Sequence, residues 1–186
     1  IISDIIDDVN PKVLWDIGGN NGEFTRLASN KGINSVLFDI DYAAIEKSYR
    51  KTIKDREENI ASFVMDFTNP SPGLGWNNKE RESIFNRSNP DMVFGLALIH
   101  HLCISNNLPL SFVAIFFSRL TSKHLVIEFV PKSDSQVKRL LETREDIFIK
   151  YDQQNFENQF LEFFAIIKTV QVENSDRVIY LMEKRT

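Results

Sequence analysis

Cysteine and long hydrophobic runs are nearly absent from this chain of 186 residues. Cys103 is its only cysteine, which excludes an intrachain disulfide and a zinc site built from several thiolates. A free thiol is typical of proteins from a reducing compartment, so we expect a cytoplasmic location. No apolar run approaches the ~18 residues that a membrane-spanning helix needs, and we therefore expect no association with a membrane.

An excess of positive charge is also lacking. Lys and Arg total 22, Asp and Glu total 26, and the formal net charge is −4. Proteins that bind nucleic acids stably neutralise phosphates with Lys and Arg, so we expect no stable nucleic-acid partner. Apolar residues make up 42% of the chain, enough for the core of one domain spanning residues 1–186. The first residue is Ile1 rather than Met, so we expect the chain to be part of a longer protein. Composition indicates no particular oligomeric state.

Hydrophobic periodicity alternates between the spacing of strands and that of helices. Strands separated by helices form βαβ units, which predicts an α/β fold with a mostly parallel sheet. The last two predicted strands are too close for a crossover helix, so they should form an antiparallel hairpin. The predicted strands are 13–17, 35–38, 62–65, 92–97, 125–130, 165–172 and 178–182, with helical spacing around 2–9, 24–28, 45–53, 110–120, 137–141 and 156–164.

Three local patterns refine this prediction. The segment 69–78 is rich in Pro, Gly and Asn, which predicts a long loop. Ser133 and Gln136 have the spacing of a capping box, which predicts that a short helix begins with Ser133 as its N-cap. Four phenylalanines recur at helical spacing and predict one helix that faces the core: Phe156, Phe160, Phe163 and Phe164.

The segment Trp15–Phe24 connects the first strand to the next helix and contains Gly18, Gly19 and Gly22. In an open parallel sheet the ligand binds beyond the carboxyl ends of the strands, where such a loop lies. Acids also end the first three strands, at Asp16, Asp39 and Asp66. A single acid there is compatible with a helix N-cap or a solvated strand end. Three acids at one edge favour a ligand that contains a nucleoside, because a carboxylate accepts both ribose hydroxyls.

Two other functions compete with this interpretation. A dinucleotide-binding loop has the spacing Gly-x-Gly-x-x-Gly, whereas Asn20 stands two residues after Gly18. Tyr180 and Lys184 have the Tyr-x-x-x-Lys spacing of some oxidoreductases but fall on the last predicted strand. An NAD(P)-dependent oxidoreductase is therefore the second hypothesis, and a non-catalytic cofactor-binding domain is the third.

The spacing Asp-x-Gly-x-Asn-x-Gly from Asp16 to Gly22 resembles motif I of the S-adenosylmethionine-dependent methyltransferases with the Rossmann-like, class I fold. The resemblance covers about residues 9–184 and implies a three-layer fold with a seven-stranded sheet in the order 3-2-1-4-5-7-6. It also implies S-adenosyl-L-methionine as the cofactor. The positions that would contact it are Asp16, Gly18, Gly19, Asn20, Gly22, Phe24, Asp39, Ile40, Asp66, Phe67 and Leu96.

In that resemblance Asp16 would hold the cofactor's amino group and Asp39 its ribose. Ile40 would pack on the adenine, and Asp66 with Phe67 would contact the adenine edge. Three further segments, 69–76, 96–102 and 127–134, look like those of a bacterial group of methyltransferases similar to the nodulation protein NoeA. Fold and cofactor do not determine the methyl acceptor, so its identity stays open.

The fourth predicted strand leads into His100 and His101, at the edge where the transferable methyl lies in this fold. An imidazole is a suitable general base for an acceptor that loses a proton. Adjacent residues diverge, so one histidine at most should face the acceptor, and the alternative is that both are structural. No third ligand stands at a recognisable spacing, so we expect no metal. The Asp/Asn-Pro-Pro-aromatic motif of base N-methyltransferases is absent here.

Three residues outside these motifs are candidates for contacting the acceptor: Trp76, Glu128 and Lys132. Trp76 alternatively covers the sheet edge, and Lys132 alternatively belongs to a solvated loop. The favoured hypothesis is a methyltransferase that acts on a small molecule at oxygen or nitrogen.

Overall fold

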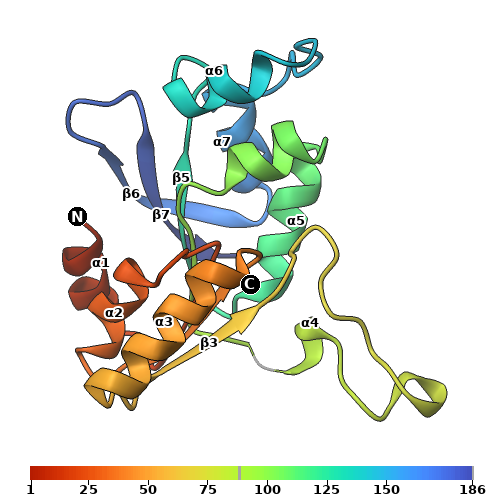
Figure 1. Cartoon of the computed structure of the whole chain (residues 1–186). Coiled ribbons are helices and arrows are strands. Elements are labelled where there is room, and N and C mark those ends of the chain that lie inside the picture. Colours follow the sequence, from red (N-terminus) through yellow and green to blue (C-terminus); the bar gives the residue numbers. More distant parts are fainter. Residues whose placement is uncertain (88, 186) are drawn as a thin grey trace.

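The computed structural model describes residues 1–87 and 89–185, and its centre is a seven-stranded sheet. The strand order is β3-β2-β1-β4-β5-β7-β6 (Figure 1). Strands β1 to β5 pair in parallel, whereas β7 runs antiparallel to both β5 and β6. The predicted mostly parallel sheet with its C-terminal hairpin is confirmed. The strands are β1 (Val13–Ile17), β2 (Asn34–Asp39), β3 (Ile60–Val64), β4 (Met92–Gly95), β5 (His124–Phe129), β6 (Phe164–Gln171) and β7 (Val178–Lys184).

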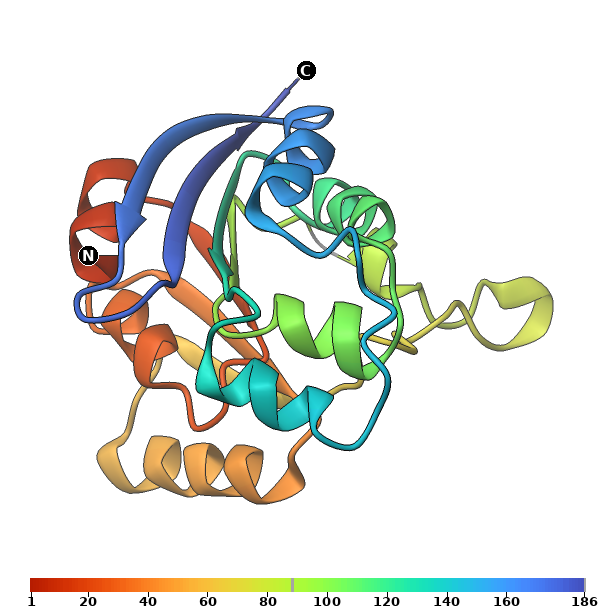
Figure 2. The same cartoon turned by 90° about the horizontal axis from the view of Figure 1, so that it is seen from above.

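Helices cover both faces of the sheet, which gives the three layers that the resemblance implies (Figures 1 and 2). One face carries α1 (Ile2–Val9), α2 (Glu23–Ser29) and α3 (Tyr42–Asp55). The other face carries α5 (Leu110–Leu120) and α7 (Gln153–Leu161), and α6 (Ser135–Leu141) lies beyond the carboxyl end of β5. No helix in the described ranges is both long and apolar enough to cross a membrane.

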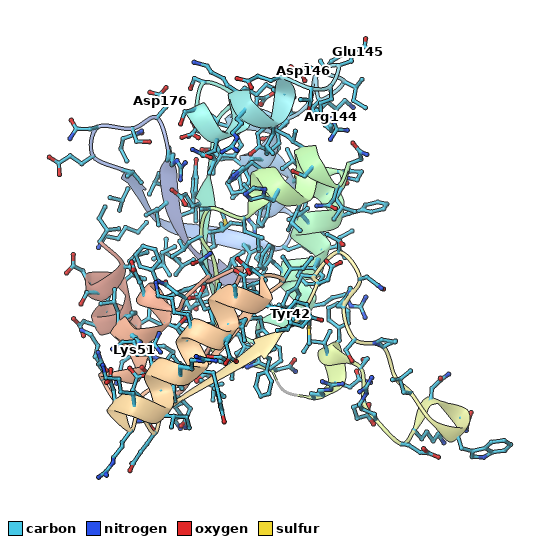
Figure 3. All side chains as sticks on the ribbon, in the orientation of Figure 1. Tyr42, Lys51, Arg144, Glu145, Asp146 and Asp176 are labelled. Atoms are coloured by element: carbon cyan, nitrogen blue, oxygen red, sulfur yellow. The ribbon has the colours of Figure 1, made fainter. Side chains whose placement is uncertain are left out.

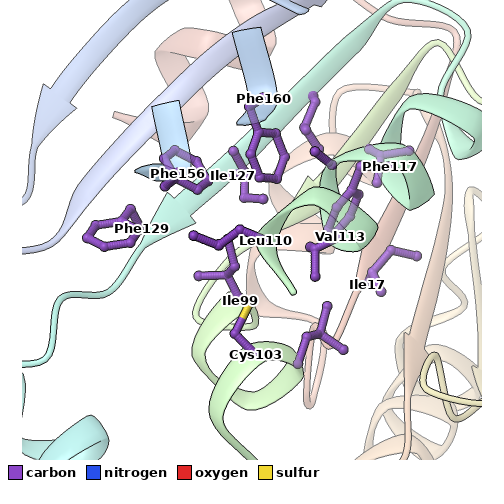
Figure 4. Packing of buried hydrophobic residues seen from close by; sticks show 14 of the residues in the cluster. Ile17, Ile99, Cys103, Leu110, Val113, Phe117, Ile127, Phe129, Phe156 and Phe160 are labelled. Carbon is purple, nitrogen blue, oxygen red and sulfur yellow. The ribbon is translucent and has the colours of Figure 1, made fainter. Parts of the chain in front are cut away.

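Phenylalanines fill the core between the sheet and the α5–α7 layer (Figure 4). Phe129 of β5 packs on Phe156 of α7 with ring centroids 5.2 Å apart, and Phe156 packs on Phe160 at 4.5 Å. The predicted single phenylalanine helix is wrong at its end, because α7 stops at Leu161 and Phe164 is the first residue of β6. Pairing of Phe164 with β7 takes the chain out of the helix.

Most other strand boundaries differ from prediction by one or two residues, and two differences bear on the site. Strand β4 ends at Gly95 rather than Ala97, because Ala97 has a φ of 47° and turns the chain out of the sheet. The N-cap of α6 is Asp134, whose carboxylate accepts a hydrogen bond from the Gln136 amide at 2.8 Å. Ser133 was predicted as this cap, but its hydroxyl instead donates to Asp176 in the β6–β7 hairpin.

A long segment between β3 and β4 extends away from the sheet (Figures 1 and 2). It holds the short turn η1 (Trp76–Asn78) and α4 (Ile84–Arg87). An isolated antiparallel bridge between Leu74 and Arg81 closes the loop around η1. The predicted loop at 69–78 lies within it. Trp76 is 86% exposed there.

Candidate active site

A cavity of about 640 Å³ lies at the carboxyl ends of the parallel strands. Its walls come from four neighbouring strand ends, because parallel strands bring the loops that follow them to one edge. The lining residues are 17, 18 and 20 at the end of β1, 39–41 at the end of β2, 65–68 after β3, and 97, 98, 101, 102, 105 and 106 after β4.

The glycine loop forms the wall beside β1. The amides of Gly18 and Gly19 both donate to the Phe38 carbonyl of β2, at 2.8 and 3.2 Å, which presses the loop onto the sheet. A Cβ on Gly19 would lie 2.5 Å from Asp16 Oδ2 and 2.5 Å from Leu37 Cδ1, so a side chain does not fit. The absence of a side chain at Gly19 therefore lets the loop lie directly on the sheet.

Asp39 occupies the end of β2 and is 9% exposed. Its Oδ2 accepts a hydrogen bond from the Asn20 amide at 2.8 Å, and its Oδ1 accepts one from the Asp41 amide at 2.9 Å. These bonds orient the carboxylate, and each oxygen keeps a lone pair for a ligand. Asp41 differs in role, because its carboxylate accepts from the Ala43 amide and caps α3.

The third wall follows β3. Asp66 accepts hydrogen bonds from both the amide and the hydroxyl of Thr68, at 2.8 and 2.7 Å. Phe67 is 9% exposed and packs edge-on against Phe38 and Phe116, with ring centroids 5.4 and 5.8 Å away. Ile40, which is 61% exposed, lines the same cavity. The arrangement offers an apolar slot with one carboxylate at its side.

Asp16 lies beneath the glycine loop and does not line the cavity. It is 1% exposed and accepts a hydrogen bond from the Thr25 hydroxyl at 2.6 Å. Burial raises the pKa of Asp16 to about 6; the Thr25 hydrogen bond opposes the rise and the Asp39 charge adds to it. A cation bound above the loop would favour the charged form of Asp16.

The two histidines have different surroundings. His101 lines the cavity from the π-helical turn η2 (His101–Ser105), whereas His100 is 2% exposed. Their ring centroids are 4.2 Å apart, and His100 Nδ1 has no hydrogen-bond partner within the described residues. Burial lowers the pKa of both rings, that of His100 to about 4. One neutral imidazole therefore faces the cavity.

The structure places the other candidate cofactor residues away from the cavity surface. Gly22 is the N-cap of α2 with a φ of 80°, and Phe24 is exposed on that helix. Leu96 is buried in the cluster that contains Phe94 and Val126, on the face of the sheet that α1 and α2 cover. The six cofactor candidates that line the cavity are Gly18, Asn20, Asp39, Ile40, Asp66 and Phe67.

The candidate acceptor residues do not line the cavity. Trp76 lies on the extended segment, and Lys132 is paired at 2.7 Å with Asp146, which lies beyond α6 in Figure 3. Glu128 is buried at the end of β5, and its Oε2 accepts a hydrogen bond from the Ala97 amide at 2.6 Å. No group of three His, Cys, Asp or Glu side chains suited to a metal occurs within residues 1–87 and 89–185.

Sequence reasoning missed most of the wall after β4. Ala97, Leu98 and Leu102 line the cavity, as do Ser105 and Asn106 at the end of η2. The left-handed conformation of Ala97 and the π-helical turn produce this wall, and neither has a signature in periodicity. The segment Ser105–Pro109, rich in Asn and closed by Pro, was the available signal for a turn there.

The chain is similar in sequence to a nodulation protein over nearly its whole length. Nodulation protein NoeA of Rhizobium meliloti (strain 1021) is 31% identical over 184 residues, which is 98% of this chain and 38% of NoeA. The chain thus spans well under half of that relative. No protein-family model matches the chain.

Two solved structures share the fold at low sequence identity. The PH0226 protein from Pyrococcus horikoshii OT3 is similar with a TM-score of 0.69 and 17% identity, over 97% of this chain and 86% of that one. Magnesium protoporphyrin IX methyltransferase (ChlM) from Synechocystis PCC 6803, solved with bound SAH, is similar with a TM-score of 0.66 and 14% identity. The match covers 99% of this chain and 80% of that one. The chain is thus a homologue of NoeA with the Rossmann-like fold of the class I, S-adenosylmethionine-dependent methyltransferases.

Proposed function

We propose that this chain binds S-adenosyl-L-methionine in the cavity at the strand ends and transfers its methyl group to a small-molecule acceptor. The observation that carries the proposal is the carboxylate of Asp39, oriented by two backbone amides and facing the cavity. A carboxylate at the end of β2, opposite a glycine loop after β1, suits a ribose with two hydroxyls. The relationship to NoeA and the fold shared with ChlM support the same assignment.

The residues present fit this cofactor along the length of the cavity. Gly18 and Asn20 would receive the methionine part, where Gly18 offers backbone without a side chain of its own. Asp39 would bind the ribose, and the slot between Ile40 and Phe67 would hold the adenine, with Asp66 at its edge. When bound, the cofactor supplies an electrophilic methyl group on a sulfonium centre.

The chain's own residues would then position the acceptor and accept its proton. His101 is the titratable group on the cavity wall after β4, and its neutral imidazole suits a general base for a hydroxyl or amine acceptor. Most of the rate enhancement would come from holding acceptor and methyl in line. Cys103 is not a candidate nucleophile, because burial raises the pKa of its thiol to about 12.

The charge of the cavity lining and the single cysteine support two further parts of the proposal, the kind of acceptor and the compartment. Among the described residues, those that line the cavity include three carboxylates and no lysine or arginine, which suits a small molecule that is not an anion. We place the protein in the cytoplasm, because its single cysteine is a buried free thiol. Residues 1–186 would form one cofactor-binding domain.

Ligand-induced stabilisation tests the proposed function. S-adenosylhomocysteine at ~100 times its dissociation constant should stabilise the domain by about 2.7 kcal/mol, because it binds only the folded state. For a domain of this size the melting temperature should rise by roughly 5–10 °C, as measured by differential scanning fluorimetry. NAD⁺ at the same concentration serves as the control and should cause no shift. A shift with NAD⁺ and none with S-adenosylhomocysteine would favour the oxidoreductase instead.

A further inference from the structure

The wall after β4 depends on an unusual backbone conformation at Ala97. Its φ of 47° lies in the left-handed region, which a residue with a Cβ adopts only at a cost. The next residue, Leu98, lines the cavity, and its carbonyl accepts hydrogen bonds from the amides of His101 and Leu102 at 2.9 and 3.2 Å. The conformation of Ala97 therefore sets where Leu98 and His101 stand relative to the cavity.

One buried carboxylate holds this turn from the neighbouring strand. Glu128 is 8% exposed at the end of β5, and its Oε2 accepts a hydrogen bond from the Ala97 amide at 2.6 Å. A hydrogen bond to a charged acceptor is stronger than one between neutral groups, so it suits a conformation that is unfavourable by itself. The bond also satisfies an amide that leaves the sheet when β4 ends.

A cation at the start of β7 lies next to the carboxylate of Glu128. Arg177, the residue just before β7, has its Nη1 3.5 Å from Glu128 Oε1. The same guanidinium donates to Asp134 at 2.7 and 3.1 Å, which fixes its plane. Ala97, Glu128 and Arg177 thus link the ends of β4, β5 and β7 through polar contacts. Burial of a carboxylate costs more free energy than burial of an apolar side chain of similar size, so stability alone does not account for Glu128 at this position.

We infer that Glu128 is a positioning residue, which holds the Ala97 turn in the left-handed conformation that places Leu98 and His101 on the cavity wall. Only the expected effect of Glu128 on cofactor binding rests on the proposed function. The hydrogen bond and the turn are properties of the chain itself. Glu128 would act through Ala97 and would touch neither the cofactor nor the acceptor.

Calorimetric titration with S-adenosylhomocysteine tests the role in four variants. Glu128→Ala should bind at least ~10-fold more weakly than the wild type, because the turn loses its clamp. Glu128→Gln should stay within about threefold, since its amide oxygen still accepts the Ala97 hydrogen bond. Adding Ala97→Gly to Glu128→Ala should restore binding to within about fivefold, because glycine adopts positive φ readily. Asp134→Asn, the matched control, disturbs the Arg177 pair and should change affinity by less than about threefold.

Recovery of binding in the double variant distinguishes positioning from a merely structural role. Normal affinity in Glu128→Ala, or no recovery in the double variant, would overturn the inference. A crystal structure of Glu128→Ala without ligand gives a readout that does not depend on the proposed function: Ala97 should leave positive φ. An unchanged turn in that structure would refute the positioning role, whether or not the wild type binds S-adenosylhomocysteine. Failure of the wild type to bind S-adenosylhomocysteine would refute only the proposed function.

Discussion

The His101→Ala variant is expected to lose turnover by ~10²–10⁴-fold while binding S-adenosylhomocysteine about as well as the wild type. His101 lines the cavity at the wall where the methyl group would meet its acceptor, and it is exposed rather than packed in the core. Its loss would remove the proton acceptor without removing a cofactor contact of the β1–β3 walls. The measurement is transfer of labelled methyl groups to the acceptor, together with calorimetric binding of S-adenosylhomocysteine.

The pH profile should identify the same residue. Partial burial of the ring lowers the pKa of His101 below its usual 6.5, although the charge of Asp39 opposes this, so the neutral ring can accept a proton at pH 7. Activity should therefore fall as the pH drops through that pKa, and His101→Ala should lack this acidic limb. His100→Leu is the control, because His100 is buried and its loss should leave the limb in place. Wild-type turnover in His101→Ala would mean that positioning alone drives the reaction.

The Gly19→Ala variant is expected to lose affinity for S-adenosylhomocysteine by ~100-fold and to melt at a lower temperature. The added Cβ would stand 2.5 Å from both Asp16 Oδ2 and Leu37 Cδ1, so the loop must move off the sheet. Overpacking of this kind costs about 1–3 kcal/mol, and a displaced loop loses its fit to the ligand. Binding is measured by calorimetry and stability by thermal melting.

Gly32→Ala is the matched control for this substitution. Gly32 has a φ of 80°, and nothing lies within 4 Å of the point where a Cβ would stand, so alanine there adds backbone strain without a collision. Its melting temperature should fall slightly, and its affinity for S-adenosylhomocysteine should not change. Equal losses of affinity in the two variants would show that the Gly19 contact with the sheet is unimportant.

The strand pattern and the acids at the strand ends were predictable because each depends on a local rule. Buried parallel strands produce continuous apolar runs, and a carboxylate directly after such a run reaches the ligand edge. Asp39 and Asp66 were assigned to one site on that basis, and the structure brings both to the same cavity. The C-terminal hairpin followed from the short connection between its strands.

Features set by tertiary contacts were not predictable in this way. Ala97 adopts positive φ where Glu128 of another strand accepts its amide hydrogen bond, and no local pattern predicts that contact. Ser133 and Asp134 are both good N-caps, and the competing partner Asp176 leaves the role to Asp134. Trp76 lies on a segment whose direction depends on the whole chain between β3 and β4.

Titration of S-adenosylhomocysteine into the wild type and Asp39→Ala tests the central claim most directly. Hydrogen bonds to a charged group are worth about 1.5–3 kcal/mol, so removal of the carboxylate should weaken binding roughly ten- to a hundredfold. Asp41→Asn is the control, because its amide oxygen can still cap α3, and it should bind nearly as the wild type does. Unchanged affinity in Asp39→Ala, or an equal loss in Asp41→Asn, would contradict a nucleoside site built on Asp39.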